Sequence, residues 1–116
     1  MPIVYHEEIE TERFDGGATY KTIVGDASGS LPIFCGIQTS PPGYCTPNHT
    51  HPYSEVITVL EGTGEAWIGN EKQKLFAGIT LIIPENTLHG FRATGKTSLI
   101  TYGIHASPKR IVTIEN

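Results

Sequence analysis

Glycine and proline recur at short intervals along the chain and limit the length of any regular element. The 116 residues include thirteen glycines and eight prolines, and neither type suits the interior of a helix or a central strand. Both types favour turns, so their abundance predicts many short elements joined by tight connections. A chain of this length has room for a single domain with one core.

Short segments of β-forming residues fill the intervals between these turns. Residues 55–60 are rich in β-branched side chains, and Gly69-Asn70 is typical of a hairpin turn. No segment keeps a helical period over ten residues or more. The spacing is typical of an antiparallel sandwich or barrel, so we expect an all-β fold. The expected strands are residues 19–24, 31–38, 55–60, 65–68, 72–76, 79–83, 89–93, 97–105 and 110–114.

The first thirty residues differ from the rest because they are polar and acidic. We interpret residues 1–30 as an N-terminal arm that packs on the barrel or on a neighbouring subunit, and residues 31–116 as the barrel itself. A small barrel gains buried area by exchanging such an arm, and two-fold dimers are the commonest assembly. A homodimer is therefore expected.

The charge and the hydropathy of the sequence argue against two classes of partner, nucleic acids and membranes. The formal net charge is −4 and the eight basic residues are scattered, which argues against nucleic-acid binding. No apolar run approaches the roughly 20 residues of a membrane helix. The acidic start does not resemble a signal peptide, so a cytoplasmic location is expected. In a reducing compartment the two cysteines are expected to be free thiols.

Three histidines and one glutamate have a spacing that could bind a metal ion. His49 and His51 stand two residues apart, and Glu55 shares their parity, so an extended chain points all three to one face. His89 could join them from a neighbouring strand. Imidazole and carboxylate together suit Fe, Mn, Co, Ni, Cu or Zn better than Mg or Ca. Histidines near turns are often packing or surface residues, and the residues alone leave both interpretations open.

The spacing around these residues resembles the first conserved motif of the cupin superfamily. Gly43 is followed by five residues, then His49-Thr50-His51, three residues, Glu55, six residues and Gly62. Each defined position of that motif is present. In this resemblance the two histidines and the glutamate are metal ligands.

A second cupin motif is similar to residues 78–93. Gly78 is followed after five residues by Pro84, and His89 occupies the histidine position. The chain departs from the motif at Asn86, where the family usually has glycine, and at Ala93, where it often has asparagine. The resemblance implies a double-stranded β-helix (jelly-roll) barrel that holds one metal ion near its mouth.

Six further residues are weaker candidates for the pocket or for catalysis. Some share the parity of the ligands, some lie on flanking strands, and one is near the first ligand. Residues 102 and 105 have opposite parity, so a regular strand turns only one of them inward. Inward positions of a barrel are mostly filled for volume, so packing is the first interpretation for each. The pocket candidates are Tyr53, Phe91 and Cys45, and the catalytic candidates are Gln38, Tyr102 and His105.

The family is too broad for the fold to specify a reaction. The resemblance is compatible with several kinds of enzyme, namely dioxygenases, isomerases, decarboxylases and lyases. It is also compatible with non-catalytic modules that bind sugars or metabolites. We expect a metal-dependent enzyme that uses one divalent Fe, Mn, Ni or Zn ion on a small oxygen-rich organic molecule. The alternative is a binding or sensing module without turnover.

Overall fold

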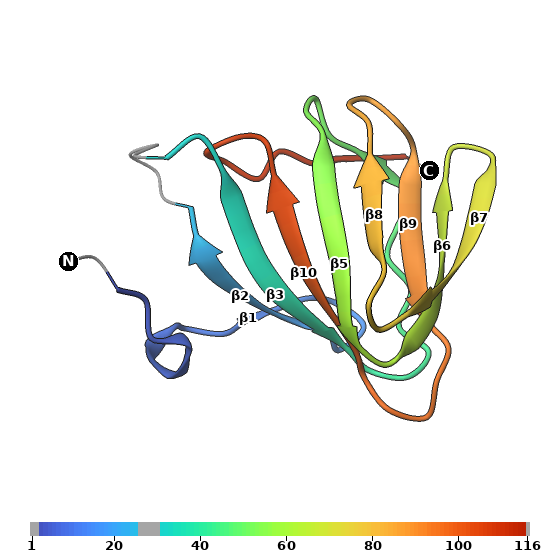
Figure 1. Ribbon diagram of the computed structural model, residues 1–116, viewed down its shortest axis with the longest axis horizontal. Coiled ribbons are helices and arrows are strands. Elements are labelled where there is room, and N and C mark those ends of the chain that lie inside the picture. Colours follow the sequence, from blue (N-terminus) through green and yellow to red (C-terminus); the bar gives the residue numbers. More distant parts are fainter. Residues whose placement is uncertain (1–2, 26–30, 116) are drawn as a thin grey trace.

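The computed structural model describes residues 3–25 and 31–115, and nearly all regular structure in this part of the chain is β-strand (Figure 1). One short 3-10 helix, η1, precedes the strands. The elements are η1 (His6–Glu8), β1 (Glu12–Arg13), β2 (Thr19–Val24), β3 (Phe34–Ser40), β4 (His49–Thr50), β5 (Glu55–Glu61), β6 (Thr63–Ile68), β7 (Glu71–Phe76), β8 (Thr80–Ile83), β9 (His89–Ala93), β10 (Leu99–His105) and β11 (Thr113–Ile114).

The strands form two antiparallel sheets (Figure 1). The larger sheet has the order β1-β2-β3-β10-β5-β8, and the smaller has the order β11-β4-β9-β6-β7. Chain neighbours β5 and β6 belong to different sheets, as do β8 and β9, so the chain repeatedly crosses between the layers. This arrangement confirms the predicted all-β jelly-roll fold.

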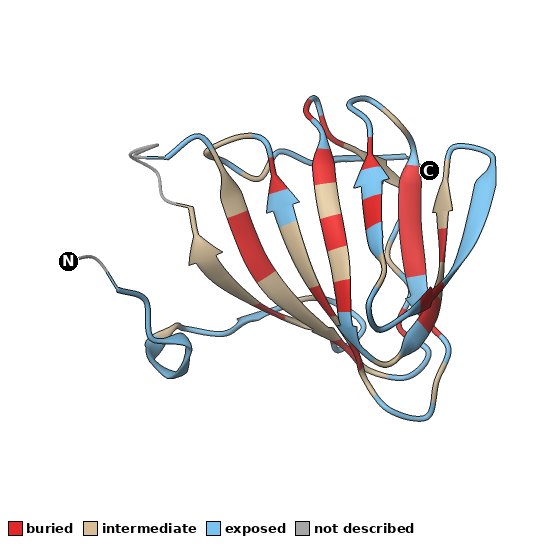
Figure 2. Ribbon diagram, in the orientation of Figure 1, coloured by how far each residue is buried: buried red, intermediate tan, exposed pale blue. Residues whose placement is uncertain are grey.

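Alternating burial along the central strands places the core between the two sheets. In β5 the residues Glu55, Ile57 and Val59 are buried, whereas their neighbours are more exposed (Figure 2). This alternation is expected of a strand with one face toward the interior. The core cluster comprises Ile57, Val59, Ala66, Leu75, Leu81, Ile83, Phe91, Ala93 and Leu99.

The predicted strands agree with the observed ones in order, and most bounds differ by a few residues. Strands at residues 19–24 and 89–93 have the predicted bounds, whereas the strand predicted at 31–38 lies at Phe34–Ser40. The hairpin at Gly69-Asn70 joins β6 to β7 as expected. The sequence did not predict β1 and β4, each of which is two residues long.

The N-terminal residues contribute two strands to the larger sheet. β2 pairs with β3, and β1 pairs with β2 at the edge. The boundary that we expected at residue 30 lies outside the described residues, so the division into arm and barrel stays a prediction. The homodimer also stays a prediction.

The two cysteines are far from equivalent in their surroundings. Cys35 is buried on β3 and Cys45 is exposed, and both are free thiols as expected.

Within residues 3–25 and 31–115, the structure contains no helix long and apolar enough to cross a membrane.

The turn before β9 contains a left-handed residue that is not glycine. Asn86 has a φ of 56°, and its backbone N–H donates a hydrogen bond to the carbonyl oxygen of His51 at 2.8 Å. Asparagine visits this conformation more readily than most residues, which explains how it replaces the glycine of the motif. The turn is thereby tied to the segment that carries two of the histidines.

Substitutions at Asn86 are expected to separate backbone strain from side-chain contacts. Asn86→Ala should lower the free energy of unfolding by about 1 kcal/mol because alanine tolerates the left-handed region poorly. Asn86→Gly should change it by less than about 0.5 kcal/mol because glycine adopts this φ freely. Urea denaturation of the three proteins measures both values. Equal stability of the alanine variant and the wild type would contradict the argument.

Candidate metal centre

Strand pairing brings the four predicted ligands to one side of the barrel interior. His49 lies on β4 opposite His89 on β9, and these two residues are direct register partners. Their ring centroids are 4.1 Å apart. His51 follows β4 immediately, and Glu55 begins β5 in the other sheet. The segment that joins the two sheets therefore carries three of the four side chains.

Backbone carbonyl groups orient three of the imidazole rings in the same way. Nδ1 of His49 lies 2.7 Å from the Pro47 oxygen, and Nδ1 of His89 lies 2.8 Å from the Thr87 oxygen. Nδ1 of His51 lies 2.6 Å from the oxygen of Ile111. A carbonyl oxygen can only accept, so each Nδ1 carries a proton and Nε2 becomes the free ligand atom. Such outer hydrogen bonds are typical of metal-binding histidines.

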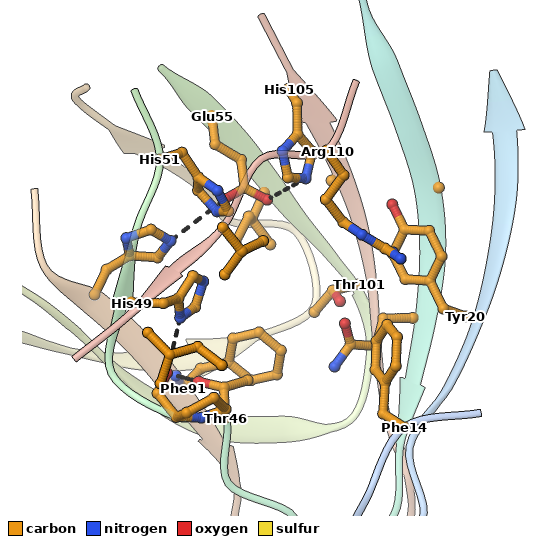
Figure 3. A pocket seen from close by; sticks show the side chains of 18 of the residues that line it. Phe14, Tyr20, Thr46, His49, His51, Glu55, Phe91, Thr101, His105 and Arg110 are labelled. Atoms are coloured by element: carbon orange, nitrogen blue, oxygen red, sulfur yellow. Dashed lines mark hydrogen bonds and ion pairs between the residues drawn. The ribbon is translucent and has the colours of Figure 1, made fainter. Parts of the chain in front are cut away.

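The Glu55 carboxylate lies at the centre of the cluster (Figure 3). Its Oε1 atom is 3.2 Å from Nε2 of His51 and 3.4 Å from Nε2 of His89. Among the described residues, neither Glu55 Oε1 nor His89 Nε2 has a hydrogen-bond partner, although both atoms are buried. Such unpartnered buried atoms are costly unless another group satisfies them. Their convergence therefore fits a shared cation.

Burial and neighbouring groups shift the pKa values of the cluster in different directions. Burial, followed by the nearby His89, lowers the pKa of His49 to about 4, which keeps this ring neutral. Burial alone would raise the pKa of Glu55, but its contacts with His105, His51 and His89 hold that pKa well below its usual range. An anionic carboxylate beside a neutral imidazole is the state that binds a metal ion.

A fourth histidine contacts the same carboxylate from the other side. Nε2 of His105 on β10 lies 3.1 Å from Oε2 of Glu55, and its Nδ1 lies 2.6 Å from the hydroxyl of Tyr53. A carboxylate only accepts, so Nε2 of His105 carries a proton directed at Oε2. This contact fixes Oε2 of Glu55, and the hydroxyl of Tyr53 in turn orients the His105 ring.

The histidines and the glutamate form two overlapping groups of possible ligand atoms. One group contains His49, His51 and His89, and the other contains His51, Glu55 and His105, with atoms within 4.8 Å of one another in each. All three histidines of the first group have a backbone carbonyl at Nδ1, whereas Nδ1 of His105 faces the hydroxyl of Tyr53. With Glu55 added, the chemistry of the donors fits a divalent transition metal.

These side chains border a cavity of about 390 Å³ inside the barrel. A cavity of this volume suits a small organic molecule. Of the other predicted residues, Phe91, Gln38 and His105 line it. Tyr53 is buried behind His105, to which it is hydrogen-bonded.

Two of the weaker candidates lie elsewhere. Cys45 is exposed and lines a shallower depression beside Trp67. Tyr102 points away from the cavity, and its hydroxyl oxygen lies 3.4 Å from the sulfur of Cys35. Of the two residues of opposite parity on β10, His105 lines the cavity and Tyr102 does not, as a regular strand requires.

The sequence did not identify several residues of the cavity wall, and two of these are Tyr20 and Arg110. Tyr20 on β2 and Arg110 after β10 lie side by side on the wall of the cavity (Figure 3). Tyr20 belongs to a segment that we interpreted as an arm, and Arg110 lies outside any regular strand. Tyr20 is an aromatic residue inside the strand predicted at 19–24 and is the one buried residue of β2, so the aromatic side chain in a predicted strand was the signal that could have identified it.

Comparison with known proteins agrees with the fold and the motifs. Residues 36–105 match the "Cupin domain" family, Cupin_2. The chain is 31% identical over 94 residues to protein SchB of Streptomyces halstedii, covering 80% of this chain and 68% of SchB. It is 32% identical over 102 residues to auxin-binding protein 1 of Arabidopsis thaliana, covering 79% of this chain and 52% of that protein.

The fold is shared with a solved enzyme structure. The polyketide cyclase RemF from Streptomyces resistomycificus superposes with a TM-score of 0.83 at 19% identity, covering all of this chain and 86% of RemF. The likeness to RemF concerns the fold, and the match to the domain family covers well over half of the chain. This chain therefore belongs to the cupin family.

Proposed function

We propose that this protein is a metal-dependent enzyme that acts on a small oxygen-bearing organic molecule. In this proposal His49, His51, Glu55 and His89 hold one divalent transition metal, either Fe, Mn, Ni or Zn. The observation that carries the proposal is the convergence of three oriented Nε2 atoms and a carboxylate oxygen that has no partner among the described residues, beside a cavity. When bound, the metal would supply Lewis-acid polarisation of a substrate oxygen.

The protein's own residues would prepare the site in three ways. Phe91 and Ile57 give the cavity apolar walls, which exclude water from around the reacting group. His105 holds Oε2 of Glu55, so that Oε1 stays directed at the histidines. The low pKa of His49 keeps its Nε2 free of a proton at neutral pH.

A binding module without turnover is the second candidate. The similarity to auxin-binding protein 1, whose name describes binding, favours it. The two candidates share the cavity and the metal and differ in whether the bound molecule is turned over. The chain spans only about half the length of auxin-binding protein 1.

Metal content and turnover together test the proposal. Elemental analysis of protein purified without an affinity tag should give close to one ion per chain. Bound iron would direct oxygen-uptake screens toward small phenols and thiols, and Mn, Ni or Zn would direct the search to isomerase, decarboxylase and lyase reactions. Turnover that is lost in His49→Ala supports the enzyme. Tight ligand binding with no turnover supports the binding module, and failure to take up any metal overturns the proposal.

Metal affinity is expected to rise with pH. Burial favours neutral His51, but its contact with Glu55 and its hydrogen bond to Ile111 outweigh burial and raise its pKa above the ordinary 6.5. The imidazolium must lose its Nε2 proton before that atom binds a metal, so acid competes with the ion. Affinity should increase by up to about tenfold per pH unit while His51 is protonated in the free protein.

Calorimetry of Zn²⁺ binding in two buffers of different ionisation enthalpy measures this proton directly. The heats should differ between the buffers below the pKa of His51 and converge above it. Identical heats and constant affinity from about pH 6 to about pH 8 would show that His51 is already neutral before the metal binds.

A further inference from the structure

The cavity contains two buried hydrogen-bond donors that no group in residues 3–25 and 31–115 satisfies. Tyr20 is only 6% exposed, and its hydroxyl has no hydrogen-bond partner among the described residues. Nη1 of Arg110 is also buried without a partner in this part of the chain. Both residues line the cavity next to the metal cluster. Buried donors of this kind are rare because each loses its hydration without compensation.

Glycines on the adjacent strands β3 and β10 make room for the side chains of Tyr20 and Glu55. A Cβ atom at Gly36 would lie 2.5 Å from the Tyr20 hydroxyl, so the phenol packs directly over the backbone of β3. A Cβ atom at Gly103 would lie 3.2 Å from Oε2 of Glu55. Gly36 and Gly103 are register partners on β3 and β10. The hydroxyl and the carboxylate thus lie over neighbouring positions of one sheet.

Aromatic rings and one carboxylate fix the plane of the Arg110 guanidinium. Its central carbon lies 4.9 Å from the ring centroid of Tyr20 and 5.4 Å from those of Phe14 and Phe34. Nη2 donates to Oε2 of Glu12 at 2.6 Å. A guanidinium held by stacking and by one ion pair presents its other nitrogen in a defined direction. That nitrogen is the unpartnered Nη1.

The two donors have the chemistry of a site for an acidic oxygen. Burial raises the pKa of Tyr20 above its ordinary value, so the phenol keeps its proton and can donate it in a hydrogen bond. Arg110 adds a charged donor, because its Nη1 stays available while Nη2 donates to Glu12. The rest of the cavity wall includes the apolar side chains of Phe91 and Val112, which suit a compact hydrocarbon body.

We propose that Tyr20 and Arg110 bind the carboxylate of a compact, largely apolar organic acid. The position of the acid's other end, toward Glu55 and the histidines, rests on the proposed function. The carboxylate itself would accept hydrogen bonds from the Tyr20 hydroxyl and from Nη1 of Arg110. This second binding site makes the substrate an acid that spans the cavity.

Calorimetric titration with sodium benzoate and with benzamide tests the proposal. The two probes have the same ring, but only benzoate carries a negative charge. Wild-type protein should bind benzoate at least about tenfold more tightly than benzamide, because hydrogen bonds to charged groups are the stronger ones. Tyr20→Phe and Arg110→Gln should each weaken benzoate binding about tenfold and leave benzamide binding nearly unchanged.

Two matched substitutions outside the cavity serve as controls. Tyr102→Phe removes a phenol that bonds to Cys35, and Arg92→Gln removes an exposed arginine that pairs with Glu65. Neither should change benzoate binding. Tyr20→Phe should also unfold at the same or a higher temperature than wild type, since it deletes a buried donor without a partner. Weaker binding without lower stability separates ligand recognition from a structural role.

Repeating the titration with His49→Ala distinguishes this proposal from the metal proposal. If the variant lacks metal but still binds benzoate in a manner that depends on Arg110, the acid site stands by itself. Benzoate binding that is equal in wild type, Tyr20→Phe and Arg110→Gln overturns the acid site whatever the metal content. Absence of benzoate binding to wild type up to the solubility of the salt also overturns it.

Discussion

Replacing His89 by alanine is expected to reduce metal affinity by at least about 100-fold, because even the loss of an outer-shell partner costs up to that amount. His89 Nε2 is buried, has no hydrogen-bond partner in the part of the chain that the structure describes, and lies 3.4 Å from Oε1 of Glu55. Alanine leaves the carboxylate in place but removes one of the converging donor atoms. Competition of the protein with a Zn²⁺ chelator of known affinity measures the loss.

His105→Ala provides the informative contrast within the same cluster. If His105 positions Glu55 without binding the ion, its removal should weaken metal binding by only about tenfold. The exposed His6 offers a matched control, and His6→Ala should bind metal like wild type. Undiminished affinity in His49→Ala together with full loss in His105→Ala would instead assign the ion to His51, Glu55 and His105.

The sequence predicted the residues of this cluster better than their roles. Parity grouped His49, His51 and Glu55 on one face, and the structure places these side chains together with His89. Parity also allowed His105 to face inward, but it could not say which imidazole nitrogen carries a proton. That assignment depends on carbonyl groups and on Tyr53, whose positions follow from tertiary packing.

The cavity wall opposite the cluster shows a different limit of sequence analysis. Tyr20 and Arg110 are ninety residues apart in the chain, and no local pattern connects them. They meet because β2 pairs between β1 and β3 in the larger sheet and the segment after β10 brings the Arg110 guanidinium over the Tyr20 ring. Strand periodicity predicts which way a side chain points, but long-range pairing decides what it contacts.

Turn chemistry was the most reliable guide to the fold. The glycines of the two motifs, Gly43, Gly62 and Gly78, all have positive φ values between 84° and 98°. Asn86 replaces a fourth glycine and keeps the same left-handed conformation. The two-residue strands β1 and β4 escaped prediction because so short a segment carries no alternation to recognise.

Gly62→Ala is expected to be among the most destabilising single substitutions in the chain. Gly62 has a φ of 84° between β5 and β6, and a Cβ atom there would lie 2.4 Å from the backbone oxygen of Ser98 and 2.8 Å from Cα of Leu99. The energy of forcing alanine into the left-handed backbone adds to the energy of its clash with rigid main-chain atoms. The free energy of unfolding should therefore fall by about 3 kcal/mol or more.

Gly78→Ala separates the two contributions to that loss. Gly78 has a φ of 98°, but no heavy atom lies within 4 Å of a Cβ atom built there. Only the backbone strain remains, so Gly78→Ala should cost about 1 kcal/mol. Urea denaturation of both variants, with equal m-values, measures the difference. Equal losses would mean that the chain relaxes around residue 62, and that the motif keeps this glycine for its backbone conformation rather than for the close approach of Ser98.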